Sequence, residues 1–133
     1  MTNNVLMGIY GVLSQIKLNK ISDRAARNTL INIHLTLHTA SQEILGKQNE
    51  LRKIHLADIP QEELLEASKG LPTSEETRTA VTRFNEDYRA LMESEATIPP
   101  FEKISRDALC DACAESGIDI TLGDLIILEP VLL

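Results

Sequence analysis

Two pairs of side chains in this 133-residue sequence have the types and the spacing that metal chemistry requires. His34 and His38 are four residues apart, which places both imidazoles on one face of a helix. Cys110 and Cys113 form a Cys-x-x-Cys pair, whose thiolates can lie on one side of a turn. Two imidazoles and two thiolates would satisfy tetrahedral zinc, so a zinc-binding helical module is one alternative for the function.

The surroundings of both pairs favour a structural role instead. More than seventy residues separate the pairs, and each falls inside a segment expected to be helical rather than in the turns that zinc ribbons use. The histidines lie beside an apolar helix face, and the cysteines lie among alanine and leucine, where cysteine acts as a small hydrophobic residue. No βαβ pattern accompanies Cys-x-x-Cys, as a redox role would require. We therefore predict no metal site and no cofactor.

A cluster of basic residues is the second candidate site. Its members are spaced by three, four and three residues, which would align them on one stripe of a continuous helix; they are Lys17, Lys20, Arg24 and Arg27. Such a stripe could hold a phosphate or an acidic protein partner. Residues 19–22 are expected to interrupt the helix, and the alternative is a solvated surface that pairs with acids of the C-terminal half. The cluster is kept as the candidate interaction site.

Catalytic motifs are not found in the sequence. The adjacent acid pairs, such as Glu62 with Glu63 and Glu75 with Glu76, lie near expected helix starts, where carboxylates interact favourably with the helix dipole. The sequence contains no nucleophile elbow, phosphate-binding loop, dinucleotide-binding loop or His-Glu-x-x-His motif. We predict that the protein is not an enzyme.

Composition and charge restrict the partners. The chain has two Tyr, two Phe and no Trp, so its core must be aliphatic, which favours helix packing and leaves no aromatic platform for nucleic-acid bases. The net charge is −7, and it is unevenly distributed: residues 1–56 carry +4 and residues 57–133 carry −11. Such a chain repels phosphate backbones, so general nucleic-acid binding is not expected.

Targeting signals are also lacking. The apolar stretch over residues 5–18 has no preceding Lys or Arg, no cleavage site after it, and polar or glycine interruptions that make it too short to cross a bilayer. Two cysteines do not form a disulfide framework. We expect a cytoplasmic protein with no membrane partner.

Hydrophobic periodicity predicts a single, mainly α-helical domain. Its expected parts are an N-terminal helix (1–21), a long helix (22–56), a connector (57–73), a third helix (74–97) and a C-terminal subregion (98–133). The long helix carries a heptad pattern at Ala26, Leu30, Ile33, Leu37, Ala40, Ile44, Leu51 and Ile54. The third helix repeats this spacing at Val81, Phe84, Tyr88 and Leu91. The two matching patterns predict a long antiparallel helical hairpin.

Capping residues set the expected helix ends. Asn3 or Asn4 would start the first helix, which we expect to run to about Leu18. Ser22 or Asp23 would cap the long helix. Thr73 with Glu76, and Thr121 with Asp124, have the spacing of capping boxes, and a short helix is expected from Ser105 to Ser116, closed by Gly117. The alternation at residues 118–120 suggests a minor β element.

The order of these segments, with the basic Lys-x-x-Lys-Ile-Ser junction at residues 17–22, resembles a group of small phage- and prophage-encoded proteins. That group carries a pattern seen here at Phe84, Asn85, Glu86, Asp87, Tyr88, Leu91 and Met92. Its closing tail is similar to residues 120–130, Ile-Thr-Leu-Gly-Asp-Leu-Ile-Ile-Leu-Glu-Pro. The chain departs from the group in the inserted helix around Cys110. The resemblance implies a viral accessory or assembly protein in the bacterial cytoplasm, and it assigns no functional residue.

The expected function is therefore a non-enzymatic phage or prophage accessory or assembly protein that acts through protein–protein contacts, including self-association into a homo-oligomer. An acidic inhibitor that sequesters a host defence protein is an alternative, because an acidic surface can imitate nucleic acid.

Overall fold

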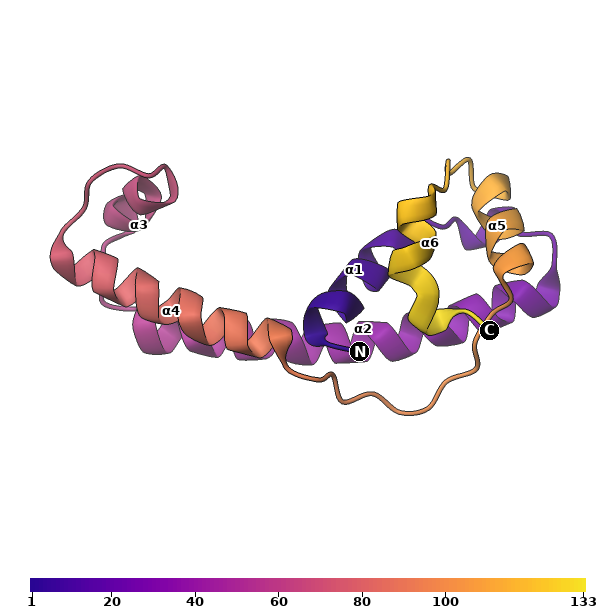
Figure 1. Cartoon of the computed structure of the whole chain (residues 1–133), viewed down its shortest axis with the longest axis horizontal. Helices are drawn as coiled ribbons and strands as arrows, with labels where there is room; N and C mark the ends of the chain where they lie inside the picture. The colour runs from indigo at the N-terminus through magenta and orange to yellow at the C-terminus, as the bar shows by residue number, and fades with distance from the viewer. The chain divides into compact units, whose positions relative to one another are not determined.

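The computed structural model describes residues 1–133 and consists of helices joined by loops, the longest of which leads from residue 94 to residue 105 (Figure 1). The α-helices are α1 (Asn3–Leu13), α2 (Arg24–His55), α3 (Gln61–Ser68), α4 (Glu75–Glu93), α5 (Arg106–Glu115) and α6 (Leu122–Leu128), with 3₁₀ turns η1 (Leu18–Lys20) and η2 (Glu129–Val131). The predicted mainly α-helical fold is confirmed. The predicted β element at residues 118–120 is wrong, because these three residues find no partner strand; only two isolated β-bridges occur, elsewhere in the chain.

The chain forms two compact units. Unit 1 contains residues 1–42 and 95–133, and unit 2 contains residues 43–94. Helix α2 contributes residues to both units. Because the two units share this helix, the expectation of a single domain stays a prediction.

The N-terminal helix is shorter than expected. Thr2 caps α1, rather than Asn3 or Asn4, by accepting a hydrogen bond from the backbone N–H of Val5. The helix ends at Leu13, not near Leu18, and the Ser14 hydroxyl donates to the Tyr10 carbonyl at 2.7 Å. The Tyr10 carbonyl also accepts from the Ser14 N–H at 2.9 Å, so the hydroxyl bond adds to the last helical hydrogen bond, and the two internal glycines weaken the helix.

Side-chain caps begin the later helices. The Asp23 carboxylate accepts from the N–H groups of Ala25 and Ala26 at 3.0 and 3.4 Å, which confirms one of the two predicted caps of α2. Helix α4 is capped by Ser74, one residue after the predicted Thr73. Ser105 caps α5, and Gly117 follows its end with φ +76°, a backbone conformation that glycine adopts without strain. The predicted capping box of α6 is present with both hydrogen bonds.

Unit 1 has a well-packed aliphatic core. Helices α1, α5 and α6, the first half of α2 and the turn η2 contribute to this core. Their fully buried side chains include Leu6, Ile9, Ile33, Leu37, Leu109, Leu128 and Val131. Each such side chain, taken out of water, contributes on the order of 2 kcal/mol to stability before conformational entropy is subtracted. No buried polar side-chain atom in the chain lacks a hydrogen-bond partner.

Segments distant in sequence close unit 1. The N-terminal ammonium group of Met1 lies 3.1 Å from the Glu95 carboxylate, and the N–H of Ala96 donates to the Met1 carbonyl at 2.9 Å. The C-terminal residues pair with the strand-like segment before α5, since the N–H of Ile104 donates to the Val131 carbonyl and the N–H of Leu133 donates to the Ile104 carbonyl. Both chain ends are therefore part of this unit.

Unit 2 is an antiparallel helix pair with α3 beside it. Helix α4 runs back along the end of α2 (Figure 1), and His55 Nε2 lies 2.6 Å from the Asp87 carboxylate. Only Ile44, Ile59 and Thr77 are buried in this unit. Its other apolar side chains, such as Phe84 and Tyr88, are only half-buried although their rings stack.

The predicted hairpin is shorter than the heptad pattern suggested. The first six positions of the pattern, Ala26 to Ile44, are all buried, but Leu51 is half-buried and Ile54 is 71% exposed. The five positions up to Ala40 lie in unit 1, whereas α4 shares unit 2 with residues 43–55 of α2. One continuous apolar stripe on α2 therefore serves two different sets of neighbours.

Candidate protein-interaction surface

The residues of the hypothetical zinc site are not assembled. His34 and His38 lie on α2 around Tyr10 of α1, whereas Cys110 and Cys113 are free thiols on α5. Nowhere in the chain do three His, Cys, Asp or Glu side chains gather in a way that could hold a metal ion. The helical positions that the sequence suggested for both pairs are correct, but the fold does not bring the pairs together.

The two histidines form a small cluster with one tyrosine. The Tyr10 hydroxyl lies 2.7 Å from His38 Nδ1, within hydrogen-bond distance, and the Tyr10 ring stacks on His34 with centroids 5.1 Å apart. Burial and the neighbouring His38 lower the pKa of His34 below its ordinary value. His34 therefore favours the neutral form, in which its ring packs against an aromatic ring without the cost of a buried charge. The arrangement packs α1 onto α2.

The two cysteines differ in their environment. Cys113 is 1% exposed in the core of unit 1, and burial, followed by the charges of Cys110 and Asp124, raises the pKa of its thiol. A buried thiol held in its protonated form is a poor nucleophile and a poor metal ligand. Cys113 thus behaves as a small core residue.

The predicted basic stripe is broken by the fold. Lys17 precedes η1, Lys20 ends it, and only Arg24 and Arg27 share a helix, because α1 stops at Leu13. None of the four forms an ion pair; the two ion pairs in the chain are those of Met1 and His55. The connection is anchored instead by backbone groups, since the N–H of Lys17 donates to Ser116 Oγ and the N–H of Ser22 donates to the Glu115 carboxylate, both at 2.9 Å. Ion pairs between these basic residues and acids of the C-terminal half therefore do not hold residues 17–27 in place.

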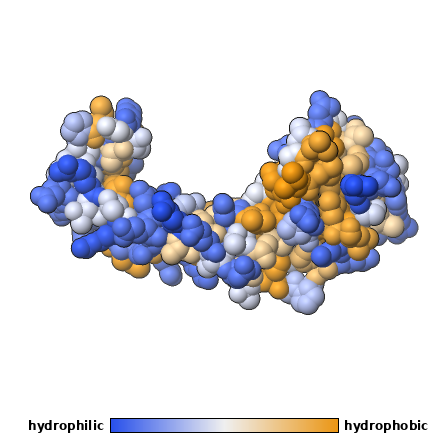
Figure 2. Space-filling model, viewed as in Figure 1, coloured by the Kyte–Doolittle hydropathy of each residue, from blue (hydrophilic) through white to orange (hydrophobic).

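An exposed apolar face on α6 is the most distinctive surface of unit 1. Leu122 is 81% exposed, Ile126 is 73% exposed and Ile127 is 41% exposed. Val5 of the adjacent α1 is 38% exposed. Figure 2 shows apolar surface gathered over α1 and α6. We call Leu122, Ile126, Ile127 and Val5 the α6 face.

Local sequence and packing hold this face outward. The capping box of Thr121 and Asp124 fixes the start of α6, and Leu128 on its inner side is fully buried. Ile127 packs over Gly8 of α1, where an added Cβ would lie 3.7 Å from Ile127 Cγ2, an ordinary van der Waals distance. Leu122 and Ile126 are one helical turn apart and both are largely exposed, so they form a contiguous apolar patch rather than single exposed side chains.

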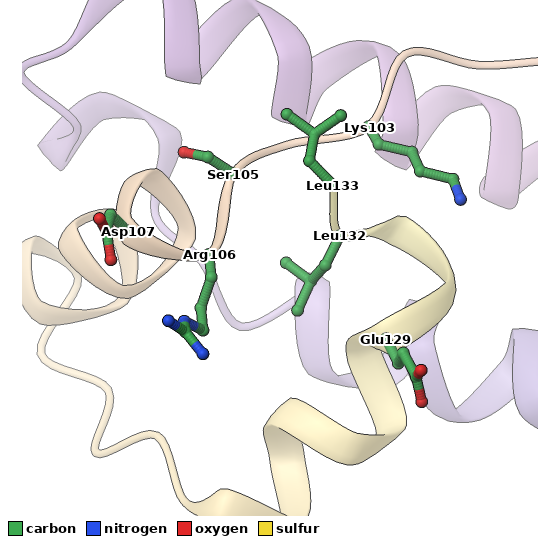
Figure 3. A pocket seen from close by; sticks show the side chains of 7 residues that line it. All are labelled: Lys103, Ser105, Arg106, Asp107, Glu129, Leu132 and Leu133. Carbon is green, nitrogen blue, oxygen red and sulfur yellow. The ribbon is translucent and has the colours of Figure 1, made fainter.

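A hollow of about 660 Å³ lies next to the chain end in unit 1 (Figure 3). Arg106 projects into it from the start of α5, Leu132 lies near its centre, and Glu129 stands on the α6 side. Lys103 points away from Arg106, so the two cations do not converge on one ligand. The charges around this hollow are therefore not arranged as an anion site.

Unit 2 contains an apolar groove of about 680 Å³ between the end of α2, α3 and α4. Its apolar lining belongs entirely to unit 2 and comes from Leu56, Ala57, Leu64, Ala67, Val81 and Phe84. Arg52 and Lys53 contribute positive charge beside them. We call this the unit 2 groove.

The sequence contained a signal for the α6 face that periodicity analysis missed. Five of the seven residues of α6 are Leu or Ile, so the helix is apolar on more than one side. A seven-residue helix at the surface can bury only one side, and the other must remain exposed or meet a partner. The sequence contains no comparable apolar run for the unit 2 groove, because the groove is formed jointly by the end of α2, α3 and α4.

Comparisons with protein-family models, with curated proteins and with solved structures gave no significant match. None of the helices has both the length and the apolar character needed to cross a bilayer.

Proposed function

We propose that this protein is a non-enzymatic interaction protein that works through the α6 face. The observation that supports the proposal is the exposure of Leu122 and Ile126 on a helix that is anchored in unit 1 by the fully buried Leu128. Hydrophobic side chains that a well-packed unit leaves in water are typical of surfaces that bind another protein. With the resemblance to phage and prophage proteins, this supports an accessory or assembly role in the bacterial cytoplasm.

A co-purification experiment with matched variants tests the proposal. Ile126→Glu places a charge in the α6 face, and Ile54→Glu makes the same change at a position of similar exposure, 71% against 73%, on α2. A protein retained from bacterial lysate by the wild type and by Ile54→Glu, but lost with Ile126→Glu, supports binding through the α6 face. Equal retention by all three baits would contradict it.

A second candidate function is an acidic inhibitor that sequesters a host protein. The observation in its favour is that Glu95 and Asp87 are the only side-chain carboxylates engaged in ion pairs, although residues 57–133 contain seventeen acids. Unpaired carboxylates leave a negative field that could imitate nucleic acid. Raising the salt concentration during the wash separates the two functions: a complex lost at moderate salt supports the inhibitor, and a salt-resistant complex supports apolar docking.

A further inference from the structure

We propose that the α6 face of one copy docks into the unit 2 groove of a second copy of this chain. This inference rests on the proposed function, since it names the partner of the α6 face. The contact joins two different surfaces, so in a bound pair one copy keeps a free groove and the other copy keeps a free face. Such a contact can repeat from copy to copy, and we propose head-to-tail self-association that continues beyond two copies.

Both surfaces are apolar where they would meet. Leu122 and Ile126 are one helical turn apart, and they are exposed by 81% and 73%. The groove is lined by six apolar side chains and has a volume of about 680 Å³. A helix laid into an apolar groove is a recurrent recognition mode, with anchors at this spacing.

Unit 2 also has few buried apolar side chains, and a further helix packed on it would bury more of them. Its only buried apolar side chains are Ile44 and Ile59, and the rings of Phe84 and Tyr88 are half-buried. An added helix over the groove would cover Leu64, Val81 and Phe84 and would turn three helical segments into a four-helix packing. Unit 1 has no comparable deficit, because its core is already closed.

Charge favours a second copy over other occupants. Glu129 follows Ile126 by three residues and remains exposed, so it extends the stripe of Leu122 and Ile126 by one turn. Arg52 and Lys53 beside the groove form no ion pair within the chain. Docking places the acid of one copy near the cations of the next, whereas two α6 faces in contact would bring like charges together.

We expect the contact between the α6 face and the unit 2 groove to be weak, because it is small. Helix α6 has seven residues, about 10 Å of length, so the interface falls below the ~1,200 Å² typical of stable complexes. We expect a dissociation constant on the order of 100 μM. Self-association therefore becomes strong only at high local concentration, such as on an assembled array.

Light scattering coupled to size exclusion, over a range of protein concentrations, tests the proposal with three variants. Ile126→Glu disables the face, Ala67→Glu disables the groove, and Ile54→Glu is the control. We expect the mass of the wild type and of the control to rise with concentration beyond two copies, and each disabled variant to stay monomeric. Circular dichroism verifies that all variants fold.

The most discriminating measurement is made on a mixture of Ile126→Glu and Ala67→Glu. Each retains one intact surface, so an equimolar mixture should form a complex of two copies that does not grow further. A groove variant that still dimerises by itself would show contact between two α6 faces and overturn the proposal. A wild type that stays monomeric at millimolar concentration would also overturn it, whereas the proposed function would still be judged separately by the co-purification experiment.

The ionic part of the contact has its own test. Lys53→Glu should weaken association by about threefold to tenfold. A charge reversal then uses two double variants. One copy carries Lys53→Glu and Ile126→Glu and offers only its groove, and the other carries Glu129→Arg and Ala67→Glu and offers only its face. The affinity of this mixed pair should be restored. Failure of the reversed charges to restore it would contradict the placement of Glu129 beside Lys53.

Discussion

Unit 1 and unit 2 are both built from helices with aliphatic side chains, but unit 1 buries many more of these side chains than unit 2 does. Along α2, Ile33 and Leu37 in unit 1 are fully buried, whereas Ile54 in unit 2 is 71% exposed. Unit 1 surrounds its half of the helix with α1, α5 and α6, and unit 2 supplies only α3 and α4. The number of covering helices, rather than the pattern on α2, decides how much of the stripe is buried.

The difference has consequences for stability. A fully buried core opens only when the whole unit unfolds, whereas half-buried segments open locally at lower free energy. We therefore expect unit 1 to be the stable part of the protein and unit 2 to gain stability from whatever fills its groove. Four experiments test this contrast.

The largest expected effect is on the free energy of unfolding. Ile33→Ala removes a fully buried side chain and should cost about 2–5 kcal/mol, because it loses burial and leaves a cavity. Ile54→Ala, on the same helix, should change stability by less than about 0.5 kcal/mol. Urea unfolding followed by circular dichroism measures both. Similar losses for the two variants would mean that unit 2 is packed as tightly as unit 1.

Thiol labelling compares the opening of the two units directly. In a Cys110→Ser background, Cys113 reports on unit 1, and Thr77→Cys with Cys113→Ala places one buried thiol in unit 2; both positions are 1% exposed. We expect the thiol at position 77 to react with iodoacetamide at least about tenfold faster, because unit 2 opens more readily. Mass spectrometry of time points gives the rates, and equal rates would remove the contrast.

Loss of a helix cap should have a smaller effect that depends on the unit. Ser105→Ala removes the hydroxyl that accepts from the N–H of Ala108, and it should lower the stability of unit 1 by about 1 kcal/mol. Ser74→Ala removes the equivalent bond to Thr77 and should raise hydrogen exchange in α4 without changing that of α5. Exchange measured by mass spectrometry separates the two outcomes, and uniform changes across both units would argue for one cooperative structure.

The smallest expected effect is a pH dependence confined to unit 1. Folding lowers the pKa of His34 below the 6.5 of the unfolded chain, so the unfolded state binds more protons in the intervening range. The stability from this group is complete above pH 6.5 and is lost as the pH falls towards the pKa of the folded state. The variant His34→Gln should show a smaller fall in melting temperature between pH 7.5 and 5.5 than the wild type. An identical fall in both proteins would show that His34 does not contribute.

Much of the local structure could be predicted from the sequence. The long helix, the cap at Asp23, the capping box of Thr121 with Asp124 and the end of α5 at Gly117 all follow from short-range rules, and all are present. Errors arose where two signals competed, as at Ser74 against Thr73 and at Ser14, which ends α1 early. The candidate site was harder to predict, since the α6 face depends on which side of a mostly apolar helix the fold covers.

The amino-acid sequence by itself determined that the protein is helical, aliphatic and acidic, because periodicity, capping and composition act over a few residues. The tertiary structure decided which apolar side chains remain in water. It separated the histidines from the cysteines, divided the stripe of α2 between two units, and left Leu122 and Ile126 exposed. These outcomes depend on contacts between segments far apart in the chain, and no local pattern encodes them.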